Sequence, residues 1–204
     1  MVARQETRPG AGEAVPAEFA TAVAQLRAAR FRAEIFCEEM PAPQRIAPYA
    51  AALSADVTDE DDDEVATGRL VLLHDPAGND AWHGTFRCVA YCRAEIEHNL
   101  AADPMLADVG WTWLIDALEA HGAEHDAASG TVTRVTTENF GAMADDPGSA
   151  QVEIRASWTP RDPTEMTAHV EAWAELLCTA GGLEPVPDGV AVMPSRRGQR
   201  GTTS

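Results

Sequence analysis

The alternation of apolar and polar residues is clearest over residues 151–158. The apolar members are Val152, Ile154, Ala156 and Trp158. A period of two places successive side chains on opposite faces of a strand. This stretch therefore predicts a strand with one buried and one polar face.

Five further strands are predicted on similar grounds, at 32–40, 53–58, 65–73, 82–93 and 130–138. In the fourth of these, Cys88 and Cys92 share a face with Phe86 and Ala90. Free cysteine is among the most buried residue types, so both thiols are predicted to pack in the core.

Three segments instead repeat their apolar residues every three or four positions, which predicts helices. The first covers residues 16–30. The second begins near Asp108, a plausible N-cap, and ends at Gly122, which suits a left-handed C-cap. The last begins at the segment DPTE, with Asp162 as its N-cap, and ends at the glycine pair 181–182.

The predicted element order is α-β-β-β-β-α-β-β-α. Short links between consecutive strands favour antiparallel pairing. One clean face per strand favours a two-layer α+β sandwich, with a mainly antiparallel sheet and helices on one face. The order is similar to that of type III secretion chaperones, many of which are dimeric binding proteins. Periodicity leaves open whether an apolar sheet face stays exposed, which would favour a dimer.

The two ends of the chain differ in composition from the middle. Residues 1–16 and 184–204 are rich in Gly, Pro and charge and predict a disordered arm and a disordered tail around one domain at 17–183. The tail carries the basic cluster RRGQRG at 196–201. No aromatic residue interleaves it, so a solvated end is favoured over a nucleic-acid contact.

The charge balance narrows the choice of partners. The chain has 33 acidic residues against 15 arginines, no lysine and a formal charge of -18. Such a chain repels phosphate and anionic lipid unless it has a local basic patch, and none is evident in residues 17–183. A protein partner, a small molecule or a second copy is favoured, while nucleic acid and membrane are disfavoured. The N-terminus does not resemble a signal peptide, so we expect a soluble cytoplasmic protein with reduced thiols.

The segment HGAEH, residues 121–125, has the spacing of the zinc peptidases called inverzincins. His121, Glu124 and His125 are therefore metal candidates. Gly122 interrupts the helix that would bring both rings together, and the apolar stripe stops before it. A solvated helix terminus is the favoured interpretation.

A second metal candidate is the segment HDPAGNDAWH, in which His74, Asp75 and His83 flank turn-forming residues. The two histidines would face each other across a hairpin mouth, although an ordinary turn is favoured. The run TDEDDDE at 58–64 predicts a solvated hairpin tip rather than a calcium loop.

Several segments resemble the actinobacterial "domain of unknown function" family numbered 3000. They are RIAPYAAAL, EVATGRLVLLHDPAGNDAWHGTFR, SGTVTR, EIRASWTPR and AWAELLC. The resemblance covers residues 17–183 and implies no established activity and no catalytic residues. It also implies a gene neighbourhood that includes ribonuclease D and uroporphyrinogen decarboxylase.

Motifs of the common nucleotide-loop proteins and serine hydrolases are absent from the sequence. We therefore expect a non-enzymatic cytoplasmic binding, adaptor or chaperone-like protein without a cofactor. Arg134 and Arg155 would form its binding groups if they share a face. A metal-dependent enzyme is the alternative, and an RNA-associated accessory protein is the weaker one.

Overall fold

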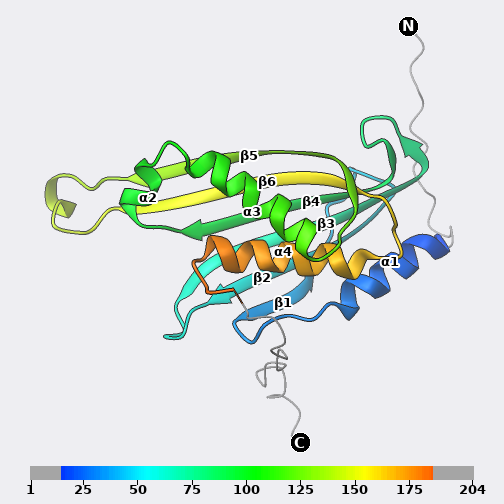
Figure 1. Ribbon diagram of the computed structural model, residues 1–204, viewed down its shortest axis with the longest axis horizontal. Coiled ribbons are helices and arrows are strands. Elements are labelled where there is room, and N and C mark those ends of the chain that lie inside the picture. The colour runs from blue at the N-terminus through cyan, green and yellow to red at the C-terminus, as the bar shows by residue number, and fades with distance from the viewer. Residues whose placement is uncertain (1–14, 186–204) are drawn as a thin grey trace, which may run out of the picture.

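The computed structural model describes residues 15–185 (Figure 1). The predicted arm and tail, with the RRGQRG cluster, lie outside these residues except for positions 15, 16, 184 and 185. The helices are α1 (Ala17–Ala28), α2 (His98–Ala102), α3 (Leu106–Ala120) and α4 (Met166–Ala180), with a 3-10 turn, η1, at Gly141–Met143. The strands are β1 (Ile35–Met40), β2 (Tyr49–Thr58), β3 (Glu64–Asn79), β4 (Gly84–Glu95), β5 (His125–Thr137) and β6 (Ser149–Pro160).

The strands form one six-stranded antiparallel sheet in the order β1-β2-β3-β4-β6-β5. The central register places Leu70 beside Ala90, and Ala90 beside Ala156. All three side chains are buried, so the alternation seen in the sequence aligns one apolar face across neighbouring strands. The predicted α+β class, with its antiparallel sheet, is confirmed; the short α2 and η1 were not predicted.

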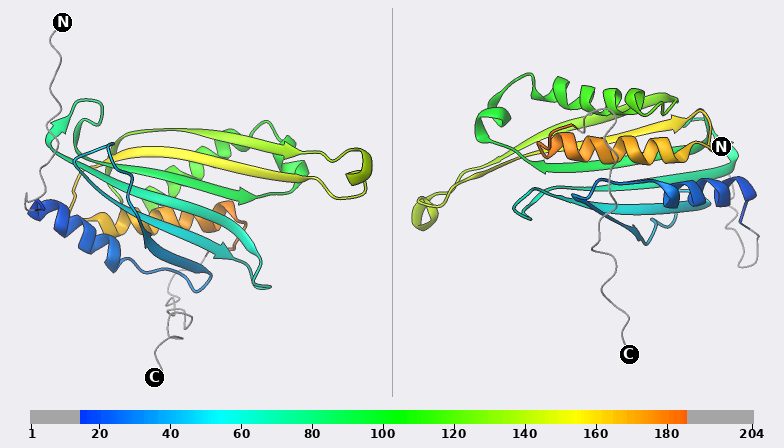
Figure 2. Two further views of the ribbon diagram at one scale, coloured as in Figure 1. Left: turned by 180° about the vertical axis from the view of Figure 1, so that it is seen from behind. Right: turned by 60° about the horizontal axis from the view of Figure 1, so that its bottom comes forward.

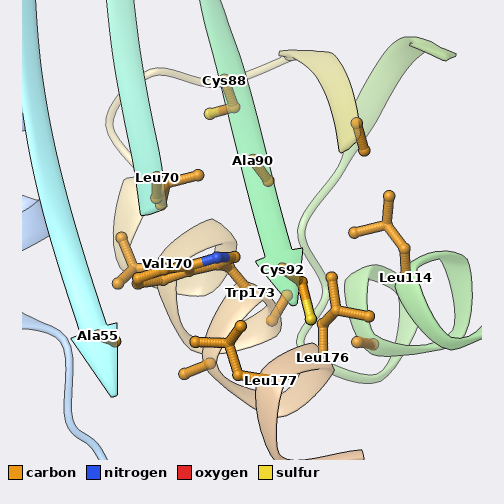
Figure 3. Close-up of a cluster of buried hydrophobic side chains, with 14 of the residues drawn as sticks. Ala55, Leu70, Cys88, Ala90, Cys92, Leu114, Val170, Trp173, Leu176 and Leu177 are labelled. Carbon is orange, nitrogen blue, oxygen red and sulfur yellow. The ribbon is translucent and has the colours of Figure 1, made fainter. Parts of the chain in front are cut away.

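The helices α1, α3 and α4 cover one face of this sheet, and within residues 15–185 no helix lies in front of the opposite face (Figure 2). Helix α4 supplies the fully buried Trp173, together with Leu176 and Leu177 (Figure 3). These pack against the buried face of the central strands, beside Leu70 and Cys92. The main core cluster, which contains Trp173, therefore lies between the helices and one face of the sheet.

Both predicted glycine ends are confirmed. Gly122 and Gly182 have φ values of +64° and +77°, which glycine adopts without steric cost. The residue after each glycine donates a backbone hydrogen bond to the preceding helix. The Ala123 amide donates to the Leu118 carbonyl, and the Leu183 amide donates to the Cys178 carbonyl. These bonds satisfy helix-end carbonyls that would otherwise lack donors.

The two predicted N-caps are wrong. Helix α3 begins before Asp108, which lies in its first turn. Asp162 precedes α4 by a full turn and instead accepts hydrogen bonds from the amide and hydroxyl of Thr164. Asp162 thus stabilises a local turn before α4, because a short carboxylate can accept hydrogen bonds from neighbouring residues outside a helix. Asp108 lies where the positive end of the α3 dipole favours an acidic side chain.

A glycine lets α3 approach the sheet closely. A Cβ at Gly130 in β5 would collide with the Arg155 carbonyl and would lie 2.7 Å from the ring of Trp111. Trp111 belongs to α3 and packs against the core. Helix α3 can therefore pack this closely against β5 only because Gly130 has no side chain.

Candidate functional site

The uncovered face of the sheet carries the polar positions of β3, β4 and β6. Seen from behind, these strands lie in front of α3 and α4 (Figure 2, left). Val89 is 37% exposed, whereas its neighbours Cys88 and Ala90 on the helical face are buried. The same strands thus bury one row of side chains and present the alternate row outward.

A hollow of about 500 Å³ lies on this face. Apolar side chains of Val71, Val89 and Tyr91 line it together with the arginines Arg69 and Arg155, and none of its described lining residues is acidic. We call it the sheet hollow. Its combination of aromatic and guanidinium groups is typical of protein-binding surfaces.

The two lining arginines are held differently. Arg155 pairs with Glu153 at 2.7 Å, and its guanidinium carbon lies 5.3 Å from the centre of the Tyr91 ring. Arg69 is exposed and has no hydrogen bond or ion pair with any residue in the described range 15–185. Arg69 is thus the more available charge for a partner.

A third arginine, Arg87, is buried at the edge of the sheet hollow, being only 7% exposed. Its guanidinium donates to the hydroxyls of Ser129, Ser157 and Thr159 and to the Ser157 carbonyl, at 2.7–3.2 Å. Ser129 and Ser157 also line the hollow. Within the described part of the chain no carboxylate pairs with Arg87, and its burial lowers the pKa of the guanidinium. A buried cation with only neutral partners is costly, so a nearby anion would stabilise it.

These arginines correct one expectation from the sequence, which showed no basic patch in the body of the chain. Arg69, Arg87 and Arg155 lie far apart in sequence but come together because β3, β4 and β6 are neighbours in the sheet. The period of two identifies the exposed positions on each strand. It does not identify which strands pair.

The predicted pair Arg134 and Arg155 does not share a face. Arg134 is opposite the buried Val152, on the helical side, and donates to the backbone carbonyls of Ala101 and Asp103. Arg155 is opposite Thr131, on the uncovered side. Of the two, only Arg155 belongs to the sheet hollow, and Arg134 holds the segment before α3.

The residues His74, Asp75 and His83 do not converge. His74 is fully buried on the helical side and stacks on Phe86 with ring centres 4.1 Å apart. Its Nδ1 lies 3.1 Å from the Thr85 carbonyl, while its Nε2 lies 3.1 Å from the Glu18 carboxylate without making a hydrogen bond there.

His83 is exposed in the turn after β3, with φ of +59°, and Asp75 accepts a bond from the nearby Ala77 amide. The expected placement of His74 opposite His83 is wrong, because β3 continues to Asn79 and places Phe86 opposite His74.

The HGAEH segment straddles the end of α3, which stops at Ala120. His121 faces α4, with its Nε2 2.5 Å from the Glu175 carboxylate. His125 begins β5 and its Nδ1 contacts the Ala123 carbonyl at 3.0 Å, while Glu124 is exposed. The two rings therefore have separate surroundings. Among residues 15–185 no group of three or more His, Cys, Asp or Glu side chains has an arrangement that could hold a metal ion.

The acidic run at 58–64 connects β2 to β3, as predicted for a hairpin tip. One oxygen of Asp59 accepts the amides of Asp61 and Asp63, at 2.9 and 3.0 Å. The loop is thus organised by its own backbone rather than by convergence of its carboxylates.

The thiols lie on the helical side of the sheet or on α4. Cys88 and Cys92 are fully buried, as predicted, and burial raises the pKa of both, that of Cys92 to about 12. Burial likewise raises the pKa of Cys37 to about 12 and that of Cys178 to about 11. Since the thiolate is the nucleophile, these groups are poorly suited to nucleophilic catalysis at neutral pH.

Fold and surface together define an α+β protein with a one-sided core and an open, arginine-bearing sheet. The model of the family described as "Protein of unknown function (DUF3000)" matches residues 15–191, and the chain belongs to this family. No curated protein and no solved structure matches the chain. In the described range, no helix is both long and apolar enough to cross a bilayer.

Proposed function

We propose that this chain is a non-enzymatic binding protein, of adaptor or chaperone type, whose sheet hollow takes up an acidic segment of a partner protein. The observation that carries the proposal is the hollow itself. It combines exposed apolar groups with Arg69 and Arg155, has no acidic lining residue, and borders the buried Arg87, which has no described carboxylate partner. A partner carboxylate would complement these charges, and its neighbouring apolar side chains would pack on Val71 and Val89.

The proposal differs from the sequence expectation of a basic partner. A formal charge of -18 does favour cations at long range. Contact specificity depends instead on charges at the binding surface, where Arg155 is paired with Glu153 but Arg69 has no partner among residues 15–185. Association should therefore depend on local arginines despite the overall repulsion.

A cytoplasmic location is part of the same proposal. The four cysteines are unpaired thiols, which is typical of a reducing compartment. A metal-dependent enzyme is less well supported, because His74 and His83 have different surroundings, as have His121 and His125.

Labelled poly-L-glutamate is a suitable probe of the sheet hollow, with poly-L-lysine as the charge-reversed comparison. We expect the polyglutamate to bind in low salt, and the affinity to fall about 10-fold or more in the Arg69→Glu variant. Arg45 is the matched control, because it too is exposed, lacks a partner in the described range and lies beyond the sheet hollow, in the β1–β2 connection. Arg45→Glu should leave binding nearly unchanged.

Affinity capture with the same two variants then tests the partner itself. The proposal would be supported by cross-linked proteins that Arg45→Glu still captures and Arg69→Glu does not. Their capture must also be unaffected by nuclease treatment. Nuclease-sensitive capture would favour the RNA-associated alternative. Concentration-dependent sedimentation of the chain alone would favour self-association, to which the exposed Phe140 and Met143 at the protruding β5–β6 connection could contribute (Figure 1).

A further inference from the structure

A second hollow, distinct from the sheet hollow, lies on the helical side of the molecule. It is enclosed by the α1–β1 connection, the end of α3, the outer side of α4 and the residues that follow α4. Its volume is about 500 Å³, within the range of small-molecule sites. We call it the α4 pocket.

The floor of the α4 pocket is apolar. Phe31 and Ile35 contribute from the N-terminal side, and Ala174 and Leu183 from α4 and the segment after it. Cys178 also lines the pocket but is almost fully buried with a raised pKa, so it serves as an apolar wall. Such a floor accommodates a compact hydrocarbon or aromatic group.

One side of the rim is basic, and its two arginines differ in their contacts. Arg32 bonds Glu34 at 3.0 Å and the Glu184 carbonyl at 2.8 Å. The Arg30 guanidinium has no hydrogen bond or ion pair with any residue from 15 to 185. Arg30 is therefore a donor with open hydrogen-bonding capacity beside the apolar floor, and it suits a carboxylate.

The opposite side of the rim is acidic. Glu171 and Glu175 project one turn apart from α4, and His121 lies between them. The Nε2 of His121 is 2.5 Å from Glu175, and its Nδ1 is 3.9 Å from Glu171. One oxygen of Glu171 accepts the Arg30 amide at 3.1 Å. Each carboxylate retains lone pairs that an ammonium group could use.

We propose that the α4 pocket binds a small zwitterion with an apolar side chain, the chemistry of a free apolar amino acid. The carboxylate would pair with Arg30, the ammonium group would lie near Glu171 and Glu175, and the side chain would cover the apolar floor. A ligand with a single charge would leave one side of the rim without a partner. Arg30 is exposed without a partner among residues 15–185, and Glu171 and Glu175 share one neighbouring histidine, so a ligand with both charges complements both sides of the rim.

L-phenylalanine is the test ligand, titrated into the full-length chain and followed by amide chemical shifts and calorimetry. Phenethylamine lacks its carboxylate, and 3-phenylpropanoate lacks its ammonium group. We expect saturable binding of L-phenylalanine, at least about 10-fold tighter than that of either analogue, with shifts centred on residues 30–35 and 171–183.

Two variants test which side chain pairs with each charge of the ligand. Arg30→Gln should weaken L-phenylalanine about 10-fold and leave phenethylamine unchanged, whereas Glu171→Gln, which keeps the acceptor for the Arg30 amide, should weaken both. Arg45→Gln is the control for loss of one exposed arginine beyond the other end of β1. The proposal is overturned if L-phenylalanine does not saturate by about 10 mM, if an analogue binds as tightly, or if Arg30→Gln has no effect.

Discussion

The two faces of this sheet are built from the same strands but have opposite environments. On β6, Ile154 is 1% exposed under α3, while the next side chain, Arg155, is 56% exposed on the uncovered face. Burial of apolar area stabilises the fold on the helical face. Exposed side chains on the uncovered face, such as Arg155, add little to that stability, so they are available for the proposed recognition. We therefore expect that stability and the proposed binding can be altered separately, at adjacent positions of one strand.

The largest expected difference is between adjacent residues of β6. Ile154→Ala should lower the free energy of unfolding by about 3 to 4 kcal/mol, because it leaves a cavity in the core. Arg155→Ala should change it by less than about 0.5 kcal/mol, because its ion pair is exposed. Denaturant unfolding measures both values, and equal losses would contradict the separation of the two faces.

The next effect is a pH dependence that arises on the helical side. Trp158 donates its indole hydrogen to His169 Nδ1 at 3.1 Å, and burial, followed by the nearby His125, lowers the pKa of His169 from 6.5 to about 4. The folded protein thus disfavours protonated His169, whereas the unfolded chain accepts the proton. This contribution to stability is complete above pH 6.5 and is lost as the pH falls toward 4, by about 3 kcal/mol.

His169→Asn preserves an acceptor for the Trp158 indole but removes the titrating group. Its unfolding free energy should fall less steeply than that of the wild type between pH 6.5 and pH 4. Parallel curves for the two proteins would show that His169 is not the group responsible. Denaturation series at several pH values provide the measurement.

A smaller difference in the free energy of unfolding is expected between two adjacent positions of β5. Gly130→Ala should destabilise the fold by about 2 kcal/mol, since its Cβ would collide with the Arg155 carbonyl and the Trp111 ring. Thr131→Ala, on the uncovered face, should cost less than about 0.5 kcal/mol. The melting temperatures of the two variants measure this difference. If Gly130→Ala melts at the wild-type temperature, α3 has room to shift.

Local patterns predicted most of the architecture. Alternation located six strands, including the buried face that carries Cys88 and Cys92, and the glycines at 122 and 182 marked helix ends. These signals depend on neighbouring residues and on backbone geometry, which the sequence contains. The predicted N-caps were wrong for different reasons. Asp162 stabilises a turn before α4, whereas Asp108 lies within the first turn of α3, where an acidic residue is also favourable.

The candidate sites were much less accessible to sequence reasoning. Arg155 was predicted as a binding group and lines the sheet hollow, whereas Arg69 and Arg87 were not predicted and Arg134 is on the other face. His121 was noticed for its spacing to His125, yet its nearest charged partners are Glu171 and Glu175, far along the chain. A signal existed for Arg69 and Arg87, because both occupy the alternating polar positions of predicted strands.

The sequence by itself determined the six strands, the three long helices, the burial of Cys88 and Cys92 and a strongly negative overall charge, because each depends on composition or on short-range periodicity. Tertiary structure decided which distant charges meet. Strand order assembled the arginines of the sheet hollow, and the packing of α4 against the end of α3 placed His121 between two carboxylates. Such contacts are set by long-range pairing of whole elements, which no local pattern specifies.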